Sequence, residues 1–243
     1  MRSESTTNAG IYDPQFVSGL FSRMSRSYER MNIVLSFGFS VRWRRQLMAL
    51  IPDSDRARSV IDLMTGMGET WNELLRRFPE AELAALDNAP GMVEHARDRN
   101  ARRFGGRFAV LCEDVLASDL PSGHFDVVVS AYGLKTFDAE QSLTLAEEVV
   151  RILKPGGHYA FIEVTEPPHK LLRALYGFYL RLFVPVIGSL LVSDPVEYRM
   201  LYRYLRAYGS GARSEAAFRR PELTLERRHH FFGCATSFSG MRL

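Results

Sequence analysis

Alternation of short apolar segments with longer amphipathic ones between residues 58 and 164 constrains the fold of this chain more than any other feature. Strands that alternate with helices pack into a mostly parallel sheet, because each helix returns the chain to begin the next strand in the same direction. We therefore predict an α/β fold with a mostly parallel seven-stranded sheet and helices on both faces. The expected elements are strands at 58–63, 82–87, 107–111, 125–131 and 158–164, helices at 69–78, 90–103 and 139–153, and a terminal antiparallel pair at 223–232 and 233–241.

Three segments flank or interrupt this alternation. Residues 1–10 are polar and are expected to form a disordered tail. Residues 11–51 carry helical periodicity, and 52–243 then form the α/β domain. Within that domain, 168–208 are expected to form two apolar helices inserted after the fifth strand. The apolar side chains that share one face of the N-terminal helices are Phe16, Leu20, Met24, Tyr28 and Met31.

The apolar run 171–192 approaches the length of a membrane-spanning helix. However, Arg173 and Arg181 lie within it, and Pro185 and Gly188 interrupt it. Arginines in a spanning helix carry a large insertion cost. The run is therefore expected to be the wall of a buried pocket or a helix that lies at a membrane surface.

Composition excludes several classes of protein. The 31 basic and 28 acidic residues leave a formal charge of only +3, so no nucleic-acid partner is expected. Residues 168–243 hold eleven arginines and one lysine against five acidic residues, which leaves open a basic surface for an anionic partner or a solvated face. The two cysteines exclude a disulfide scaffold and a cysteine-based zinc site, and no metal is expected. The polar N-terminus lacks the apolar segment of a signal peptide, which predicts a cytoplasmic location.

A glycine-containing turn follows the first expected strand. Ligands of open parallel sheets bind beyond the carboxyl ends of the strands, and the first such end is at Asp62. Gly66 and Gly68 allow a sharp turn and close approach of a ligand to the backbone. The segment matches neither the GxGxxG fingerprint nor a Walker A loop. By itself, the turn indicates a ligand site only weakly.

Acidic residues also end the next two strands. Asp87 is placed to accept both hydroxyl hydrogens of a ribose, although it also precedes an expected helix that it could cap. Asp114 is placed to accept an amino hydrogen, with Val115 packing on a ring. Three acids in strand order favour a nucleoside ligand.

With these residues in view, the chain resembles the class I S-adenosylmethionine (SAM)-dependent methyltransferases, which have a Rossmann-like fold. It is most similar to the ubiquinone/menaquinone biosynthesis C-methyltransferases, from about residue 16 to 206. The stretches 28–38 and 176–188 are specific to that family, whereas the glycine turn and Lys154-Pro155-Gly156-Gly157 are shared more widely. The resemblance implies SAM as co-substrate and a lid formed by the N-terminal helices. The residues it assigns to SAM are Asp62, Met64, Thr65, Gly66, Met67, Gly68, Asp87, Asn88, Met92, Asp114, Val115 and Ser130.

The chain departs from the family pattern at positions that face the two substrates. Met64 and Met67 replace small residues around Gly66, and either line the methionine part of SAM or point into the core. Lys135-Thr136 stands where the family has Arg-Asn, and Arg203-Tyr204 where it has Glu-Ser. The quinol acceptor of the family is therefore not assigned to this chain by the resemblance alone.

We expect a SAM-dependent enzyme, most simply a methyltransferase acting on a small aromatic, quinol-like or secondary-metabolite acceptor. Non-methylating SAM chemistry remains an alternative: cyclisation of SAM to azetidine-2-carboxylate with release of methylthioadenosine, or transfer of its amino group to a quinone. A non-catalytic SAM-binding scaffold is a further alternative. The expected partners are SAM and a small molecule, with a homodimer and a peripheral membrane contact through 168–208 left open. The candidates for the catalytic pocket, chosen by their match to family segments, are Tyr28, Tyr132, Tyr176 and Tyr198.

Overall fold

The computed structural model describes residues 9–25, 28–52, 58–191 and 195–243. Of residues 9, 28, 30, 183–191 and 195–198 it describes only the backbone. Most of the predicted 1–10 tail thus lies outside the described residues, while 9 and 10 begin a short 3-10 helix.

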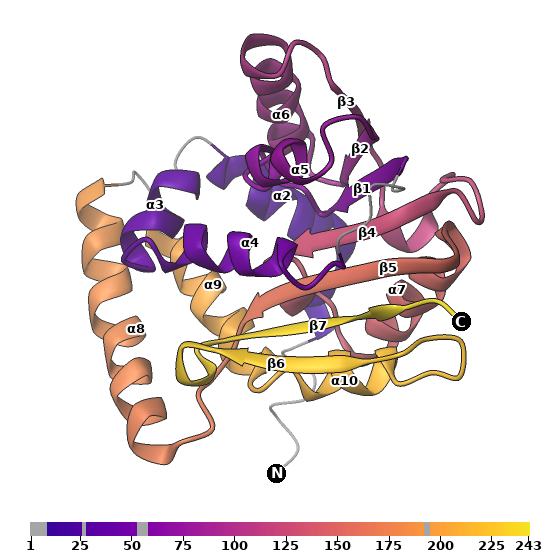
Figure 1. The fold of residues 1–243 in the computed structure, drawn as a ribbon. Helices are drawn as coiled ribbons and strands as arrows, with labels where there is room; N and C mark the ends of the chain where they lie inside the picture. The colour runs from indigo at the N-terminus through magenta and orange to yellow at the C-terminus, as the bar shows by residue number, and fades with distance from the viewer. Residues whose placement is uncertain (1–8, 26–27, 53–57, 192–194) are drawn as a thin grey trace.

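Seven strands form one sheet in the order β3-β2-β1-β4-β5-β7-β6, which confirms the predicted α/β architecture (Figure 1). The first five strands are parallel, and β7 runs antiparallel to both β5 and β6. The chain order reverses between β1 and β4, and ligands of such sheets bind at that point. The strands are β1 Ser59–Leu63, β2 Glu82–Asp87, β3 Phe108–Cys112, β4 Phe125–Ala131, β5 Leu153–Val164, β6 Glu226–His230 and β7 Ala235–Met241.

Each face of the sheet packs against its own set of helices, because successive side chains of a strand point to opposite faces. Ile61 and Val128 belong to the cluster that contains α7 and α10. Val60 and Val129 belong to the cluster that contains α4, α5 and part of α6. The helices are α2 Pro14–Met24, α3 Tyr28–Leu35, α4 Phe39–Met48, α5 Trp71–Arg77, α6 Pro90–Arg103, α7 Ala139–Ile152, α8 Lys170–Leu191, α9 Pro195–Tyr208 and α10 Ala212–Phe218, and the 3-10 turns are η1 Ala9–Tyr12, η2 Val115–Ala117, η3 Leu134–Thr136 and η4 Phe231–Gly233.

Local sequence sets where several of these helices begin. Asp13 accepts a hydrogen bond from the Phe16 N–H at 2.9 Å, which caps α2 ahead of Pro14. Asp138 and Gln141 form a reciprocal capping box at the start of α7. These caps supply partners for backbone N–H groups that the first helical turn leaves unpaired.

Two predicted features differ in detail from the structure. The fifth strand is predicted at 158–164, but β5 already begins at Leu153, directly after α7 ends at Ile152. A register shift between Phe125 and Val127 of β4 accommodates that irregular start. The predicted N-terminal apolar face is also wrong at Phe16, which is exposed, whereas Leu20, Met24 and Met31 are buried in a separate cluster. Val17, the next residue along α2, turns toward that cluster in place of Phe16.

The predicted insertion after the fifth strand is present as α8 and α9, whereas α10 was not predicted. In Figure 1, α8 runs along the outer edge of the molecule, beside α9. Among the described residues, no helix combines the length and apolarity that crossing a membrane requires.

Helix α2 lies against the start of α6, at the carboxyl end of β2. The Ser18 hydroxyl donates to the Asn88 carbonyl at 2.8 Å, and the Gly91 N–H donates to Ser22 Oγ at 3.2 Å. A Cβ atom at Gly91 would meet the Ser22 carbonyl oxygen at 2.8 Å. The two helices therefore approach each other through a position that only glycine fits.

Substituting Gly91→Ala is expected to destabilise the chain by roughly 1–2 kcal/mol, because backbone must move to admit the methyl group. Gly177→Ala is the matched control, since Gly177 is also helical and a Cβ added there would meet nothing within 4 Å. The control should be neutral or stabilising by up to about 1 kcal/mol. Urea unfolding measures both, and equal stability of the two variants would contradict the close packing of α2 on α6.

Candidate active site

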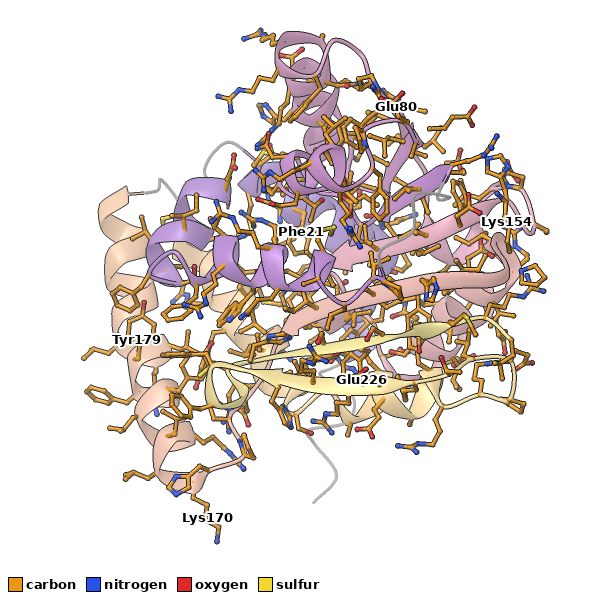
Figure 2. All side chains as sticks on the ribbon, viewed as in Figure 1. Phe21, Glu80, Lys154, Lys170, Tyr179 and Glu226 are labelled. Atoms are coloured by element: carbon orange, nitrogen blue, oxygen red, sulfur yellow. The ribbon has the colours of Figure 1, made fainter. Side chains whose placement is uncertain are left out.

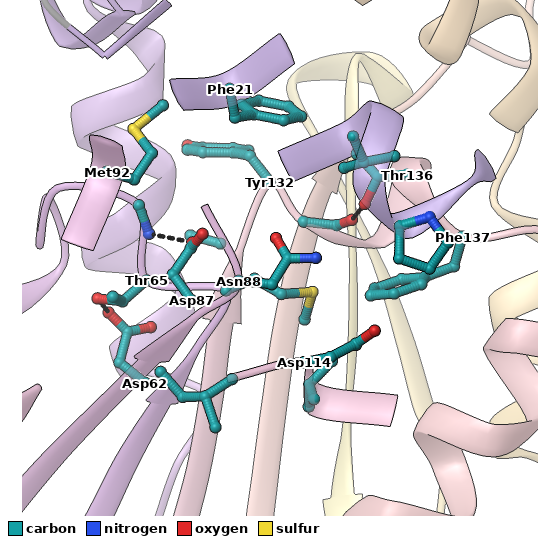
Figure 3. Close-up of a pocket in the computed structure, with 18 of the residues that line it drawn as sticks. Phe21, Asp62, Thr65, Asp87, Asn88, Met92, Asp114, Tyr132, Thr136 and Phe137 are labelled. Carbon is teal, nitrogen blue, oxygen red and sulfur yellow. Dashed lines mark hydrogen bonds between the residues drawn. The ribbon is translucent and has the colours of Figure 1, made fainter. Parts of the chain in front are cut away.

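A narrow cavity of about 80 Å³ lies beyond the carboxyl ends of β1, β2 and β4, beneath α2 (Figure 3). Phe21 from α2 and Met92 from α6 lie on one side of it, and Asp114 lies on the opposite side. The N-terminal helices therefore cover the position at which parallel sheets bind ligands. Of the twelve residues assigned to SAM, nine line this cavity: Asp62, Met64, Thr65, Gly66, Asp87, Asn88, Met92, Asp114 and Val115.

Asp62 organises the turn between β1 and α5. Its Oδ2 accepts hydrogen bonds from Thr65 Oγ1 at 2.7 Å and from Thr70 Oγ1, and Trp71 Nε1 donates to Thr65 Oγ1 at 2.9 Å. The other oxygen, Oδ1, is buried and has no hydrogen-bond partner among the described residues. Burial raises the pKa of Asp62 to about 6, because a charged carboxylate is costly to remove from water. The turn thus presents an unpaired carboxylate oxygen within the cavity lining.

The backbone of this turn uses left-handed conformations. Gly68 has a φ of +80°, and a Cβ there would meet the Trp71 ring at 2.5 Å. Met64 has a φ of +53°, which is strained for a residue with a side chain. Its sulfur lies 2.5 Å from where a Cβ of Gly133 would be, so the β1 and β4 turns pack directly together. Met64 lines the cavity and also packs against the core cluster that contains Ile61.

Three residues assigned to SAM from the sequence do not line this cavity. Met67 is buried with Met92 in the cluster beneath the N-terminal helices. Gly68 is packed against the Trp71 ring. Ser130 is buried within β4, on the face of the sheet opposite Asp62. The placement of Ser130 follows from the strand period of two, because residues 129 and 130 face opposite ways.

Asp87 and Asp114 lie at the ends of their strands, as expected, and each also accepts hydrogen bonds from backbone N–H groups. Asp87 accepts hydrogen bonds from the Gly66 N–H at 2.8 Å and the Ala89 N–H at 2.9 Å. Burial raises the pKa of Asp87. Asp114 Oδ1 accepts from the Leu116 N–H at 3.0 Å and caps η2. Each carboxylate oxygen can accept more than one hydrogen bond, so these contacts leave capacity for a ligand.

Two charged lining residues were not predicted from the sequence. Glu69 follows the glycine turn, and its Oε2 accepts from the Met67 N–H at 3.1 Å. Its Oε1 is buried without a hydrogen-bond partner among the described residues, and burial raises its pKa to about 7 against the opposing effect of Arg44. Arg44 is buried on α4, and its guanidinium lies 6.0 Å from the centre of the Tyr132 ring. Two sequence signals could have identified these residues. Arg44 lies on the apolar face that carries Trp43, and Glu69 directly follows the glycine turn.

A second, larger cavity of about 450 Å³ adjoins the first, and Asn32 and Tyr132 line both. Tyr132 donates from its hydroxyl to the Ser40 carbonyl at 2.7 Å and has a φ of +69°. Tyr176, from α8, lines the second cavity, and burial raises the pKa of its hydroxyl. The side chains of Tyr28 and Tyr198 lie outside the described residues. The remaining lining is largely apolar and aromatic, including Leu35, Phe37, Phe39, Trp43, Val164, Leu172, Tyr179, Leu180, Leu201, Tyr202, Leu205 and Phe231.

One ion pair lies in the wall of the second cavity. Lys135 Nζ is 3.2 Å from Glu163 Oε1, and the two side chains are 7% and 0% exposed. Glu163 also accepts from the backbone N–H groups of Lys135 at 3.0 Å and Val164 at 2.7 Å. The carboxylate is thus held by backbone as well as by the lysine. His229 and His230, which are bases by residue type, hydrogen-bond to hydroxyls of β7 at the far edge of the sheet.

The fold and the paired cavities define a class of protein. Solved structures similar to this chain include a SAM-dependent methyltransferase from Aquifex aeolicus, with 18% identity, a TM-score of 0.51, and coverage of 76% of this chain and 82% of that one. The mitomycin 7-O-methyltransferase MmcR has 19% identity, a TM-score of 0.61, and coverage of 92% and 60%. At these identities the likeness shows the fold, which is that of the SAM-dependent methyltransferases.

Sequence comparison identifies the family. The model of the ubiE/COQ5 methyltransferase family matches residues 9–241, so the chain belongs to that family. Demethylmenaquinone methyltransferase from Thermus thermophilus is 35% identical over 78% of this chain and 84% of its own. The ubiquinone/menaquinone biosynthesis C-methyltransferase from Geobacter sulfurreducens is 34% identical over 72% of this chain and 68% of its own. The chain is thus a SAM-dependent methyltransferase, with SAM as co-substrate, which confirms the predicted fold class, enzyme class and co-substrate.

The raised pKa of Glu69 predicts how pH affects stability without ligand. A carboxyl whose pKa is higher in the folded than in the unfolded chain binds more protons when folded. Its contribution to the free energy of unfolding therefore falls as the pH rises from about 4.5 to about 7. Glu69→Gln should remove this loss and make the chain more stable than the parent at pH 8, by on the order of 1–3 kcal/mol.

Urea unfolding at pH 5 and pH 8 measures this difference. Glu140→Gln on α7 is the matched control, because Glu140 is exposed and should change stability little at either pH. A Glu69→Gln variant less stable than the parent at pH 8 would contradict the burial cost assigned to this carboxylate.

Proposed function

We propose that this chain transfers the methyl group of SAM to a ring carbon of a small quinol-like acceptor. SAM binds in the first cavity and the acceptor in the second. The observation that carries this proposal is the junction of the two cavities at Tyr132 and Asn32. A donor and an acceptor held on either side of that junction are oriented without free diffusion, which is a large part of catalysis in a two-substrate reaction.

The charges of the first cavity fit SAM. The unpaired oxygens of Asp62 and Glu69 suit its ammonium and sulfonium groups, and the Arg44 guanidinium suits its carboxylate. Asp87 accepts the ribose hydroxyls and Asp114 the adenine amino group, while Val115 and Met92 pack on apolar surface. SAM supplies an electrophilic methyl group. The chain's own part is to hold these groups and to exclude water with the N-terminal helices.

The lining of the second cavity fits an aromatic acceptor that carries an acidic hydroxyl. Aromatic and apolar side chains surround a flat ring, and the ammonium of Lys135 favours an anionic ring oxygen. Ionisation of that oxygen enriches the neighbouring ring carbon in electrons. The carbon then forms a bond to the methyl group, the methyl–sulfur bond breaks with its electron pair left on sulfur, and the ring carbon loses its proton. The relatives named above as demethylmenaquinone and ubiquinone/menaquinone biosynthesis methyltransferases support a quinol acceptor.

Non-methylating SAM chemistry is the second candidate, and the carboxyls of Asp62 and Glu69 favour it. Cyclisation to azetidine-2-carboxylate and amino transfer to a quinone both require the amine of SAM to be neutral. Burial raises the pKa of these two carboxyls to about 6 and about 7, which makes each a better proton acceptor than an ordinary carboxylate. In the cyclisation, the neutral nitrogen attacks the γ-carbon, the carbon–sulfur bond breaks, and methylthioadenosine leaves.

The proposal also includes where and with what the chain acts. Its partners are SAM and a small-molecule acceptor, it acts in the cytoplasm, and it forms a homodimer. Residues 168–208 make a peripheral contact with a membrane, which suits an acceptor of low water solubility.

Product analysis by mass spectrometry separates these reactions. The purified chain is incubated with SAM alone and with SAM plus a short-chain demethylated menaquinol. We expect S-adenosylhomocysteine and a methylated quinol only when the quinol is present. Methylthioadenosine formed from SAM alone would identify the reaction as cyclisation and refute methyl transfer. An aminated quinone would identify it as amino transfer. Bound SAM with no product in either reaction would identify the chain as a non-catalytic SAM-binding scaffold.

The role of Lys135 is tested with a charge-balanced double variant, Lys135→Met with Glu163→Gln. Removing both charges avoids leaving either one buried and unpaired, which would itself strongly destabilise the chain. We expect SAM affinity close to that of the parent and a kcat roughly 100-fold lower, because the acceptor oxygen loses its cation. Lys154→Met with Asp126→Asn removes a partly exposed pair, 2.9 Å apart, at the opposite ends of β4 and β5. This control should keep the parent kcat, and an equal loss in both variants would refute the assignment.

A further inference from the structure

Helix α8 exposes a continuous apolar stripe on its outer face. Leu171, Leu175, Phe178 and Leu182 are 64%, 58%, 62% and 48% exposed. Their spacing of four, three and four residues places them on one side of the helix, and we call them the α8 stripe. Figures 1 and 2 show α8 at the edge of the molecule, with Tyr179 and Lys170 marking its course. Contiguous apolar surface of this kind marks an interaction site rather than ordinary surface.

The same helix forms a wall of the proposed acceptor cavity. Leu172, Tyr176 and Tyr179 lie one position after members of the α8 stripe and line the cavity. One residue corresponds to about 100° of helix rotation, so the cavity wall and the exposed stripe are adjacent faces of α8. Whatever covers the stripe therefore lies beside the acceptor cavity.

Exposed aromatic side chains continue this surface. Phe37 is exposed and its ring lies 5.4 Å from that of Tyr179, and Phe231 is exposed with its ring 4.2 Å from that of Phe39. Both Phe37 and Phe231 line the acceptor cavity, and the exposed Phe232 follows. We call Phe37, Phe231 and Phe232 the aromatic rim.

The backbone of the aromatic rim is strained. Its three residues have φ values of +49°, +44° and +56°. The other positive-φ residues with side chains in the described part of the chain, Met64 and Tyr132, line the first cavity. Such conformations are unfavourable for residues with side chains and are retained mainly where they position a ligand contact. These backbone conformations direct large apolar side chains outward at the edge of the acceptor cavity.

The charge of α8 complements an anionic surface. Lys170, Arg173 and Arg181 are exposed, and the sequence of this helix contains no acidic residue. Arg173 also donates to the carbonyls of Pro167 and Pro168 at the helix start, which leaves its positive charge in place. An exposed apolar stripe flanked by basic side chains is the pattern of a helix that lies in the interface of an anionic bilayer. A symmetric contact between the α8 helices of two copies would instead bring like charges together.

We propose that the α8 stripe and the aromatic rim dock on an anionic phospholipid bilayer, with the acceptor cavity opening beside the docked face. The apolar side chains enter the level of the headgroups and the basic side chains contact lipid phosphates. The proposal deepens the membrane contact of the proposed function, and it rests on that function in its assignment of the second cavity to the acceptor. Docking itself requires neither SAM nor turnover.

Co-sedimentation with vesicles tests the docking. The full chain is mixed with vesicles of phosphatidylcholine alone and of phosphatidylcholine with phosphatidylglycerol. We expect binding to the anionic vesicles that weakens with added salt and little binding to the neutral ones. Leu175→Asp with Phe178→Asp should weaken binding by roughly tenfold or more. Leu143→Asp on α7 is the matched control, because Leu143 is 47% exposed and lies outside the docking surface.

Charge is tested separately from apolar contact. Arg181→Glu should weaken binding to anionic vesicles several-fold, whereas Arg103→Glu, at an exposed position on α6, should keep parent binding. Parent-like binding by the Leu175→Asp, Phe178→Asp variant would overturn the proposal, as would failure of the parent to bind anionic vesicles. A parent dimer that this variant converts to a monomer, without vesicle binding by the parent, would assign the surface to self-association instead.

Activity toward a short-chain, water-soluble quinol keeps this test distinct from the proposed function. The Leu175→Asp, Phe178→Asp variant should retain parent activity on that acceptor in solution, because neither residue lines either of the two cavities. Vesicle binding without methyl transfer by the parent would refute the proposed methyl transfer and leave the docking surface intact.

Discussion

The hydrogen bonds to the buried Asp62 carboxylate hold the turn on which the site depends. Thr65 and Thr70 both donate to Asp62, and Trp71 donates to Thr65. Trp71 is in turn stacked on Phe108, with ring centres 4.1 Å apart. The turn is therefore fixed between β1, the start of α5 and β3. It leaves one Asp62 oxygen without a partner among the described residues, so the same group that shapes the backbone also presents an unpaired oxygen in the cavity lining.

The N-terminal helices and the α8–α9 insertion enclose the cavities that lie beyond the carboxyl ends of the strands. Helix α2 closes the first cavity by packing on α6, and the Tyr204 hydroxyl of α9 donates to the Ile11 carbonyl beneath it. Tyr132 separates the two cavities, because its hydroxyl is tied to the Ser40 carbonyl of α4. Segments far apart in the chain thus meet around the two adjoining cavities. A two-substrate enzyme needs this arrangement to exclude water while both substrates are bound.

Much of the fold and part of the site could be predicted from the sequence. The strands and helices of the alternating region were predicted within a few residues, because parallel strands buried on both faces form short apolar runs between amphipathic helices. Asp62, Asp87 and Asp114 line one cavity, since the carboxyl ends of parallel strands meet at one edge. Ser130 and Met67 do not line that cavity. Which face of the sheet Ser130 points to depends on the alternation of side chains along β4, and the orientation of Met67 depends on packing against α6. Neither can be read from the neighbouring residues in the sequence.

The sequence by itself determined the α/β class, the family and the order in which acidic residues reach the ligand edge, because these follow from periodicity and local motifs. Only the tertiary structure decided which charged groups share a cavity. Arg44 and Glu69 lie 25 positions apart in the chain, yet line the same site. Lys135 and Glu163 become a buried pair only when β4 and β5 lie side by side. The α8 stripe is likewise apolar in sequence, but its exposure depends on which face α8 turns toward the cavity. Burial and pairing are properties of three-dimensional neighbours, so they arise only once the chain has folded.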